Sequence, residues 1–182
     1  MTPLPRISTR FSAALIAASL SFAAPQIAFA AGGDTPPTSV KCAEGKVKDK
    51  TTGKCVDADS QLLDDDERYE AVREYAYAEQ FGNAEIVLAT FADDTDPRVL
   101  NYKGFINRKQ GNMDAAMEYY AQALTIDPDY ILARSYMGQG MAASGDHDGA
   151  KMQLAEIRER GGRNTWAYTS LQMALRGVQT NY

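Results

Sequence analysis

The sequence predicts an all-α fold in which antiparallel helix pairs stack on one another, and an internal repeat is the main reason. Two copies of 34 residues follow each other, at 97–130 and 131–164. The residues matched at this spacing are Gly104 with Gly138, Ala116 with Ala150, Tyr120 with Leu154, and Ala123 with Ile157. A fixed period of this size indicates stacked supersecondary units.

Turn signals divide each copy into two helices. Gly111-Asn112 and Gly145-Asp146 lie 34 residues apart, with Gly placed to end one helix and Asn or Asp placed to begin the next. Asp127-Pro128 closes the first copy, because the residue before a proline is disfavoured in the α region. Each copy is therefore predicted to be a helix–turn–helix unit.

The small residues of the repeat indicate where the two helices cross. Gly104 and Gly138 fall in the middle of predicted helices, where Gly costs about 1 kcal/mol relative to Ala. A close helix crossing offsets this cost, since no Cβ separates the backbones. We expect Ala116 and Ala150 to be the small partners, with Tyr120 filling the space one turn further on.

The two copies resemble the tetratricopeptide repeat family. The resemblance is carried by Gly104, Gly111-Asn112, Ala116, Tyr120, Ala123-Leu124 and Asp127-Pro128, then by Met137-Gly138, Gly145-Asp146, Ala150 and Leu154. It departs from the family pattern at Leu100 and Arg134, where an aromatic residue is usual, and at Gly162, where the closing proline is usual. The resemblance implies a short right-handed solenoid whose first helices line a concave, peptide-binding groove.

The resemblance also selects candidate binding residues. On the first helices of the two copies they are Asn101, Tyr102, Phe105, Arg108, Lys109, Tyr136 and Gln139. Tyr102 and Phe105 offer rigid apolar area, and Arg108 offers a planar donor fork for a carboxylate or carbonyl. Some family members clamp a carboxylate with Lys, Arg and Asn, but here only the first copy offers cations. Phe105 has a second interpretation, burial against the neighbouring helix pair.

Two further segments extend the stack. Residues 61–96 are predicted to form a degenerate first helix pair, with helices at 68–81 and 84–92 and a turn at Gly82-Asn83. In that register Tyr75 and Val87 occupy the positions of the small residues. Residues 165–182 are predicted to be a capping helix and tail, with Trp166 covering the last apolar face.

The N-terminal residues have the pattern of a secretory signal. Arg6 and Arg10 precede a short apolar run, and Ala28-Phe29-Ala30 fits a cleavage site, so 1–30 is predicted to be removed. The periplasm is the expected location, or secretion; an uncleaved anchor is the alternative, and no membrane span is expected after cleavage. Cleavage changes the net charge from −5 to −7 by removing two arginines. Such a charge disfavours nucleic acid and anionic membranes as partners.

Cys42 and Cys55 are predicted to form one disulfide in the segment 31–60, a linker followed by a small hairpin. Val47 and Val56 suggest two very short strands that need the cross-link. We expect this hairpin to stand apart from the helical repeats. The alternatives are free or metal-bound thiols and, for the lysine-rich stretch 46–54, a docking site for an acidic partner.

No pattern in the sequence indicates catalysis. His147 is the single histidine, and no nucleophile is placed beside it by local sequence. Asp57 and Asp59 begin an acidic stretch without the Gly and Glu of a calcium loop. We therefore expect no catalytic residue, metal or cofactor, and a protein or peptide partner. Two alternatives are a carbohydrate- or peptidoglycan-binding module that uses the groove tyrosines, and an enzyme without a recognisable motif; the oligomeric state is not indicated.

Overall fold

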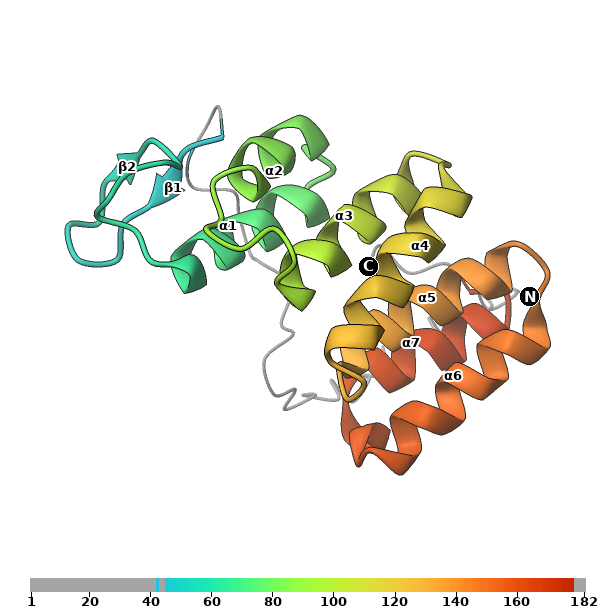
Figure 1. The fold of residues 1–182 in the computed structure, drawn as a ribbon. Helices are drawn as coiled ribbons and strands as arrows, with labels where there is room; N and C mark the ends of the chain where they lie inside the picture. Colours follow the sequence, from blue (N-terminus) through green and yellow to red (C-terminus); the bar gives the residue numbers. More distant parts are fainter. Residues whose placement is uncertain (1–41, 43–44, 179–182) are drawn as a thin grey trace, which may run out of the picture. The chain divides into compact units, whose positions relative to one another are not determined.

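The computed structural model describes Cys42 and residues 45–178; the predicted signal segment 1–30, the linker up to residue 41 and the last four residues lie outside this description. The described chain is mostly helical, with a small hairpin before the helices (Figure 1). Its elements are β1 (Val47–Lys48), β2 (Cys55–Val56), α1 (Asp65–Tyr77), α2 (Phe81–Leu88), α3 (Pro97–Lys109), α4 (Met113–Ile126), α5 (Ile131–Ala143), α6 (His147–Glu159), the 3-10 turn η1 (Gly162–Asn164) and α7 (Trp166–Leu175).

The two predicted repeats are the helix pairs α3–α4 and α5–α6, and their turns have the predicted chemistry. Gly111 and Gly145 both adopt a φ of +87°, a left-handed conformation that favours glycine. Asp146 caps α6 by accepting a hydrogen bond from the backbone N–H of Gly149, whereas Asn112 precedes α4 without a side-chain cap. Pro97 opens α3 in the first turn, where its missing N–H costs no helical hydrogen bond.

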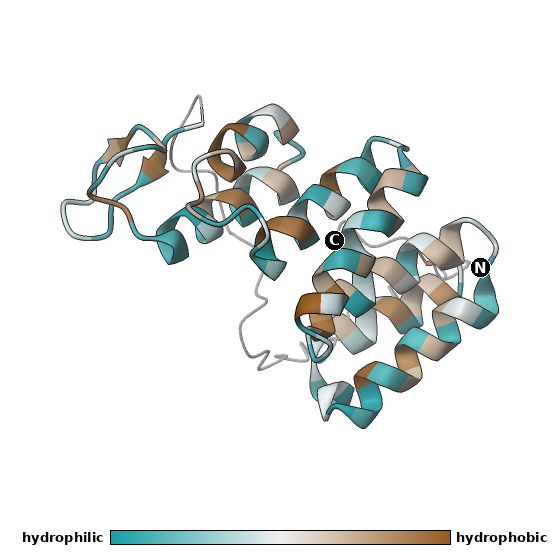
Figure 2. Cartoon of the chain, in the orientation of Figure 1, coloured by the Kyte–Doolittle hydropathy of each residue, from teal (hydrophilic) through white to brown (hydrophobic). Residues whose placement is uncertain are grey.

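Glycines mark close helix approaches, as the repeat predicts. A Cβ added to Gly104 would lie 2.6 Å from the ring of Tyr120, so α3 and α4 cross tightly there. A Cβ added to Gly138 would lie 2.7 Å from Leu171 of α7, a partner that the repeat did not predict. Ala116 and Ala150 are fully buried, as expected of the small residues of the repeat. Along α6, hydrophobic (brown) and hydrophilic (teal) residues alternate (Figure 2).

The first helix pair exists, but its predicted turn is wrong. Gly82 and Asn83 lie inside α2, and the turn falls three residues earlier, at Glu79, whose φ is +57°. In this register Ala84, which is fully buried, takes the place of Ala116. The turn was misplaced because Gly-Asn is a stronger turn signal than Glu. The packing of α2 instead favours the register that buries the small residue Ala84.

The hairpin is closed by the predicted Cys42–Cys55 disulfide, and β1 pairs antiparallel with β2. It does not stand apart from the helices. Val47 is 1% exposed and belongs to the same hydrophobic core as residues of α1 and α3. The hydroxyl of Tyr75 in α1 donates to the carbonyl oxygens of Cys42 and Lys46, at 2.9 and 2.7 Å. The hairpin therefore covers the first helix pair.

At the other end of the described chain α7 packs against α5 and α6, as a capping helix should (Figure 1). Leu171 and Ala167 of α7 are fully buried, whereas Trp166 is only half-buried. The contact also contains a polar cluster: the hydroxyl of Ser135 donates to the carbonyl of Ala167 at 2.7 Å, and Gln139 donates to Ser135 and Ser170.

Among the described residues, none of the helices combines the length and apolarity that a membrane crossing demands.

Candidate functional site

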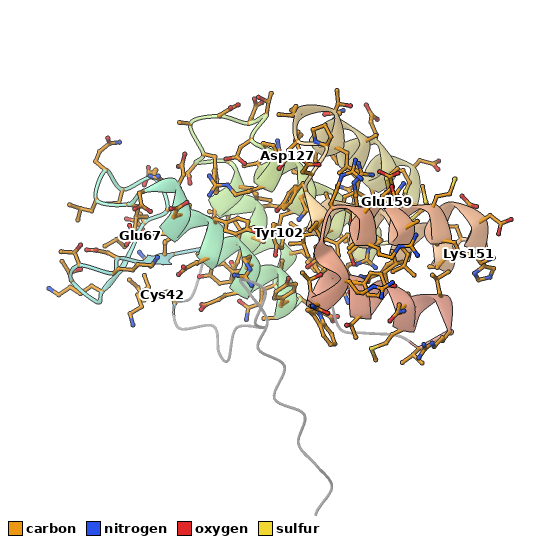
Figure 3. The ribbon with its side chains drawn as sticks, turned by 90° about the horizontal axis from the view of Figure 1, so that it is seen from below. Cys42, Glu67, Tyr102, Asp127, Lys151 and Glu159 are labelled. Carbon is orange, nitrogen blue, oxygen red and sulfur yellow. A yellow bond between two sulfur atoms is a disulfide. The ribbon has the colours of Figure 1, made fainter. Side chains whose placement is uncertain are left out.

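Aromatic side chains from three first helices meet on the inner face of the helix stack. Tyr69 and Tyr77 come from α1, Tyr102 and Phe105 from α3, and Tyr136 from α5; we call these five residues the inner aromatic cluster. The ring of Tyr102 lies 5.7, 6.2 and 6.5 Å from the rings of Tyr69, Tyr77 and Tyr136. Figure 3 shows Tyr102 in the interior of the described chain, with side chains around it.

The aromatic residues predicted to bind a partner are buried in this structure. Tyr102 and Phe105 are 0% exposed, and Tyr136 is 1% exposed. The expectation that Tyr102 and Phe105 present apolar surface is therefore not met, whereas the alternative of burial for Phe105 is. The pattern of the repeat placed these residues on the correct face of α3 and α5, but it did not show that α1 and α5 approach closely enough to cover that face. Their role in binding stays a prediction.

The two predicted amides are also buried, in different ways. Gln139 is 5% exposed, and its amide donates to Ser135 and Ser170 at the contact between α5 and α7. Asn101 is 0% exposed, and neither its Oδ1 nor its Nδ2 has a hydrogen-bond partner among the described residues. The buried amide of Asn101 therefore carries a desolvation cost that no other described residue offsets by a hydrogen bond.

Arg108 is the cation that the inner aromatic cluster holds in place. Its guanidinium carbon lies 5.4 Å from the ring of Phe105 and 5.7 Å from the ring of Tyr136. Its Nε donates to the hydroxyl of Tyr120 at 3.4 Å, and its Nη2 is buried without a hydrogen-bond partner among the described residues. Arg108 therefore has hydrogen-bonding capacity that the described chain does not use.

Lys109 is partly neutralised by its surroundings. Its ammonium forms a 3.2 Å ion pair with Glu79, at the turn after α1, and lies 5.9 Å from the centre of the Phe105 ring. Glu79 is largely exposed, so this pair contributes little to stability. The two predicted cations differ accordingly: Lys109 is paired, and Arg108 retains the unused donor.

A cleft of about 380 Å³ opens beside these two cations. Its described lining comes from the C-terminal parts of α3, α5 and α7, the residues just after α7 and the first residue of α6: Arg108, Lys109, Gln139, Ala142, Ala143, His147, Ala174, Gly177 and Val178. No carboxylate is found among these described lining residues. The cleft lining thus combines apolar residues with cationic and neutral polar groups, which suits an anionic ligand group.

The buried tyrosines Tyr102 and Tyr120 remain neutral hydrogen-bonding groups. Burial raises the pKa of Tyr102 well above 10, and the surrounding tyrosines raise it further. Burial raises the pKa of Tyr120 to about 12, with Arg108 acting in the opposite direction. At neutral pH both hydroxyls therefore keep their protons.

A second cleft, of about 330 Å³, separates the hairpin from α1. Its walls carry opposite charges, with lysines on the hairpin and glutamates on the helix: Lys46, Lys48, Lys50, Glu67, Glu70 and Glu74. Lys46 pairs with Asp57 at 2.6 Å, and Lys50 pairs with Glu70 at 3.1 Å. Intramolecular partners thus already offset much of the positive charge that made the hairpin a candidate for docking an acidic partner.

Within the described residues no group of His, Cys, Asp or Glu side chains is arranged to hold a metal ion.

Sequence reasoning missed the contribution of α7 to the cleft, and it missed Tyr77. Ala174, Gly177 and Val178 carry no pattern that distinguishes a cleft wall from the end of a capping helix. The position of Tyr77 in the repeat could have indicated it. With the turn placed at Glu79, Tyr77 is the last residue of the first helix of its pair, as Lys109 is in the next pair. The error in the turn hid this equivalence.

Comparison with known proteins identifies the repeat. Residues 97–130 match the family model of the tetratricopeptide repeat. No significant match was found among curated proteins or among solved structures. Tetratricopeptide repeats typically serve as scaffolds for protein–protein interaction and are typically non-catalytic. The matched segment is the α3–α4 pair, and its spacing recurs in the next pair of the same helical stack, so residues 97–130 form a tetratricopeptide repeat within a stack of similar helix pairs.

Proposed function

We propose that this protein is a non-catalytic interaction module of the cell envelope that holds a segment of another protein on its inner face. The segment carries a carboxylate, from an acidic side chain or a chain end, that reaches the cleft at the end of α3. The proposal deepens the family's usual role as an interaction scaffold by naming one surface and one anchoring group.

The arrangement of Arg108 is the observation that carries the proposal. Its guanidinium is held over the rings of Phe105 on α3 and Tyr136 on α5, so little side-chain entropy remains to be lost on binding. Arg108 lines a cleft whose described lining has no carboxylate, and its Nη2 is buried without a hydrogen-bond partner among the described residues. Charge-assisted hydrogen bonds from guanidinium to carboxylate are among the strongest available in proteins.

The glycan-binding alternative is not favoured by the positions of the aromatic rings. Stacking on a sugar requires an exposed ring face, and the rings of Tyr102 and Tyr136 are almost entirely buried. The cleft lining given by the structure holds neither of them. The carboxylate of a protein segment is instead matched by the cations and apolar residues that line the cleft.

The test uses a library of fluorescein-labelled octapeptides with free carboxyl ends, read by fluorescence anisotropy against the full-length chain. We expect acidic members to bind, and Arg108→Gln to weaken their binding about tenfold or more, since a hydrogen bond to a charged group is lost. Lys103→Ala is the matched control, because it removes a cation of α3 that does not line the cleft. Equal affinity of parent and a folded Arg108→Gln variant would refute the site.

Export through a cleaved signal forms the second part of the proposal, supported by the sequence of residues 1–30. The intact mass of the protein recovered from a periplasmic fraction should correspond to a chain that begins near Ala31. A recovered chain that begins at Met1 would contradict the proposed location.

A further inference from the structure

Two pairs of tyrosine hydroxyls join helices that are not neighbours in the stack. The hydroxyl of Tyr77 in α1 lies 2.5 Å from that of Tyr136 in α5, and the hydroxyl of Tyr69 in α1 lies 3.4 Å from that of Tyr130, just before α5. We call these two contacts the clasps. In solenoids each repeat ordinarily contacts only its sequence neighbours, so a contact that bypasses α3 is exceptional.

The clasps close the inner face over α3. Tyr102 of α3 donates to the hydroxyl of Tyr77 at 3.2 Å, and its ring contacts rings from both α1 and α5. The result is the complete burial of Tyr102 and Phe105, the residues that the repeat places on the binding face. A protein segment therefore reaches that face only where α1 and α5 separate.

A buried amide on α3 lacks the hydrogen-bond partners that its counterpart on α5 has among the described residues. Asn101 of α3 corresponds, 34 residues earlier, to Ser135 of α5. Ser135 is satisfied by the carbonyl of Ala167 in α7, whereas Asn101 is buried with both of its amide atoms unpartnered among the described residues. Water or the backbone of a bound segment supplies these partners once the face opens, so the cost of burying Asn101 is relieved in the open state.

We propose that the inner face is a gated groove, held closed by the Tyr77–Tyr136 and Tyr69–Tyr130 clasps and opened by separation of α1 from α5. This gate rests on the proposed function, since it regulates access of a protein segment to the same face. The closed structure is the resting state, and apparent affinity for a segment is reduced by the fraction of molecules that are closed.

The gate is tested first in the free protein, by the distance between spin labels on α1 and α5. Ala78→Cys and Ser144→Cys place labels on the exposed residues that follow these two helices, in the oxidised full-length chain where Cys42 and Cys55 are bonded. Tyr69→Phe with Tyr77→Phe removes the clasp hydroxyls of α1 but keeps both rings. We expect the distance distribution to gain a longer component, with helical circular dichroism unchanged.

Tyr119→Phe is the matched control, because it removes a hydroxyl from a half-buried tyrosine of α4 outside the clasps. It should leave the distance distribution as in the parent. A folded double variant with the parent distribution would overturn the gate, and this readout involves no ligand, so it stands apart from the proposed function.

The octapeptides that bind the parent give the second readout. Loss of the clasp hydroxyls should raise their affinity about two- to tenfold, the change expected from weakening the closed state by one or two hydrogen bonds. A longer distance component without any gain in affinity would refute the gating of this ligand while leaving the cleft itself to the Arg108→Gln test. Equal gains in the double variant and in Tyr119→Phe would also refute it.

Discussion

Individual glycines set how closely the helices of this protein approach. Gly104 and Gly82 both lie within helices, but their surroundings differ. A Cβ at Gly104 would meet the buried ring of Tyr120, whereas a Cβ at Gly82 would meet nothing within 4 Å. The same substitution should therefore have opposite effects at the two positions.

Gly104→Ala should lower the free energy of unfolding by about 1–3 kcal/mol, because the rigid ring of Tyr120 has to shift within a packed core. Gly82→Ala should raise it by up to about 1 kcal/mol through helix propensity alone. Urea denaturation of the two variants measures both changes. Stabilisation by Gly104→Ala would contradict the close crossing of α3 and α4.

At the scale of elements, the hairpin and α1 stabilise each other. Arg68 near the start of α1 donates to the carbonyls of Ala58, Ser60 and Leu63, which orders the segment between β2 and the helix. Glu67 accepts hydrogen bonds from the backbone of Asp64, in a capping box, and from the backbone of Lys50. The start of α1 is therefore tied to the hairpin turn as well as to its own N-cap.

Tyr75→Phe tests this dependence with little change of volume. It removes the hydroxyl that serves the carbonyls of Cys42 and Lys46, and we expect a loss of about 1–3 kcal/mol in the free energy of unfolding. Hydrogen exchange should accelerate in the hairpin and in α1 more than in α5. Tyr168→Phe, on half-buried Tyr168 of α7, is the control. Unchanged exchange in the hairpin would show that it does not depend on α1.

For the whole molecule, the inner aromatic cluster joins three helix pairs that otherwise contact one another in sequence order. Tyr102 contacts rings of both α1 and α5, so its removal should affect the pairs on either side. This is a stronger linkage than nearest-neighbour packing provides in a repeat protein.

Tyr102→Ala should cost about 3–5 kcal/mol, the usual range for truncating a buried aromatic residue. The loss should appear as a lower urea midpoint for the whole helical signal, measured by circular dichroism. Tyr119→Ala, at a half-buried tyrosine outside the cluster, should cost less. An equal loss in the two variants would contradict the central place of Tyr102.

The sequence by itself determined the all-α class, the two helix pairs from residue 97 onward, their turns and the disulfide. It did so because these depend on local chemistry: Gly at a positive φ, Asp before a helix, Pro at a boundary, and two cysteines close together. The 34-residue period also placed Asn101, Tyr102, Phe105 and Arg108 on one face of α3, since helical spacing fixes which residues share a face.

Only the tertiary structure decided whether that face is open. Burial of Tyr102 depends on how closely α1 and α5 approach across α3, and the position of the first turn at Glu79 depends on packing Ala84 against the core. The docking of the hairpin depends on the long-range bonds of Tyr75. Contacts between residues about 30 to 60 positions apart leave no local pattern, because they arise from the sum of small rotations between successive helix pairs.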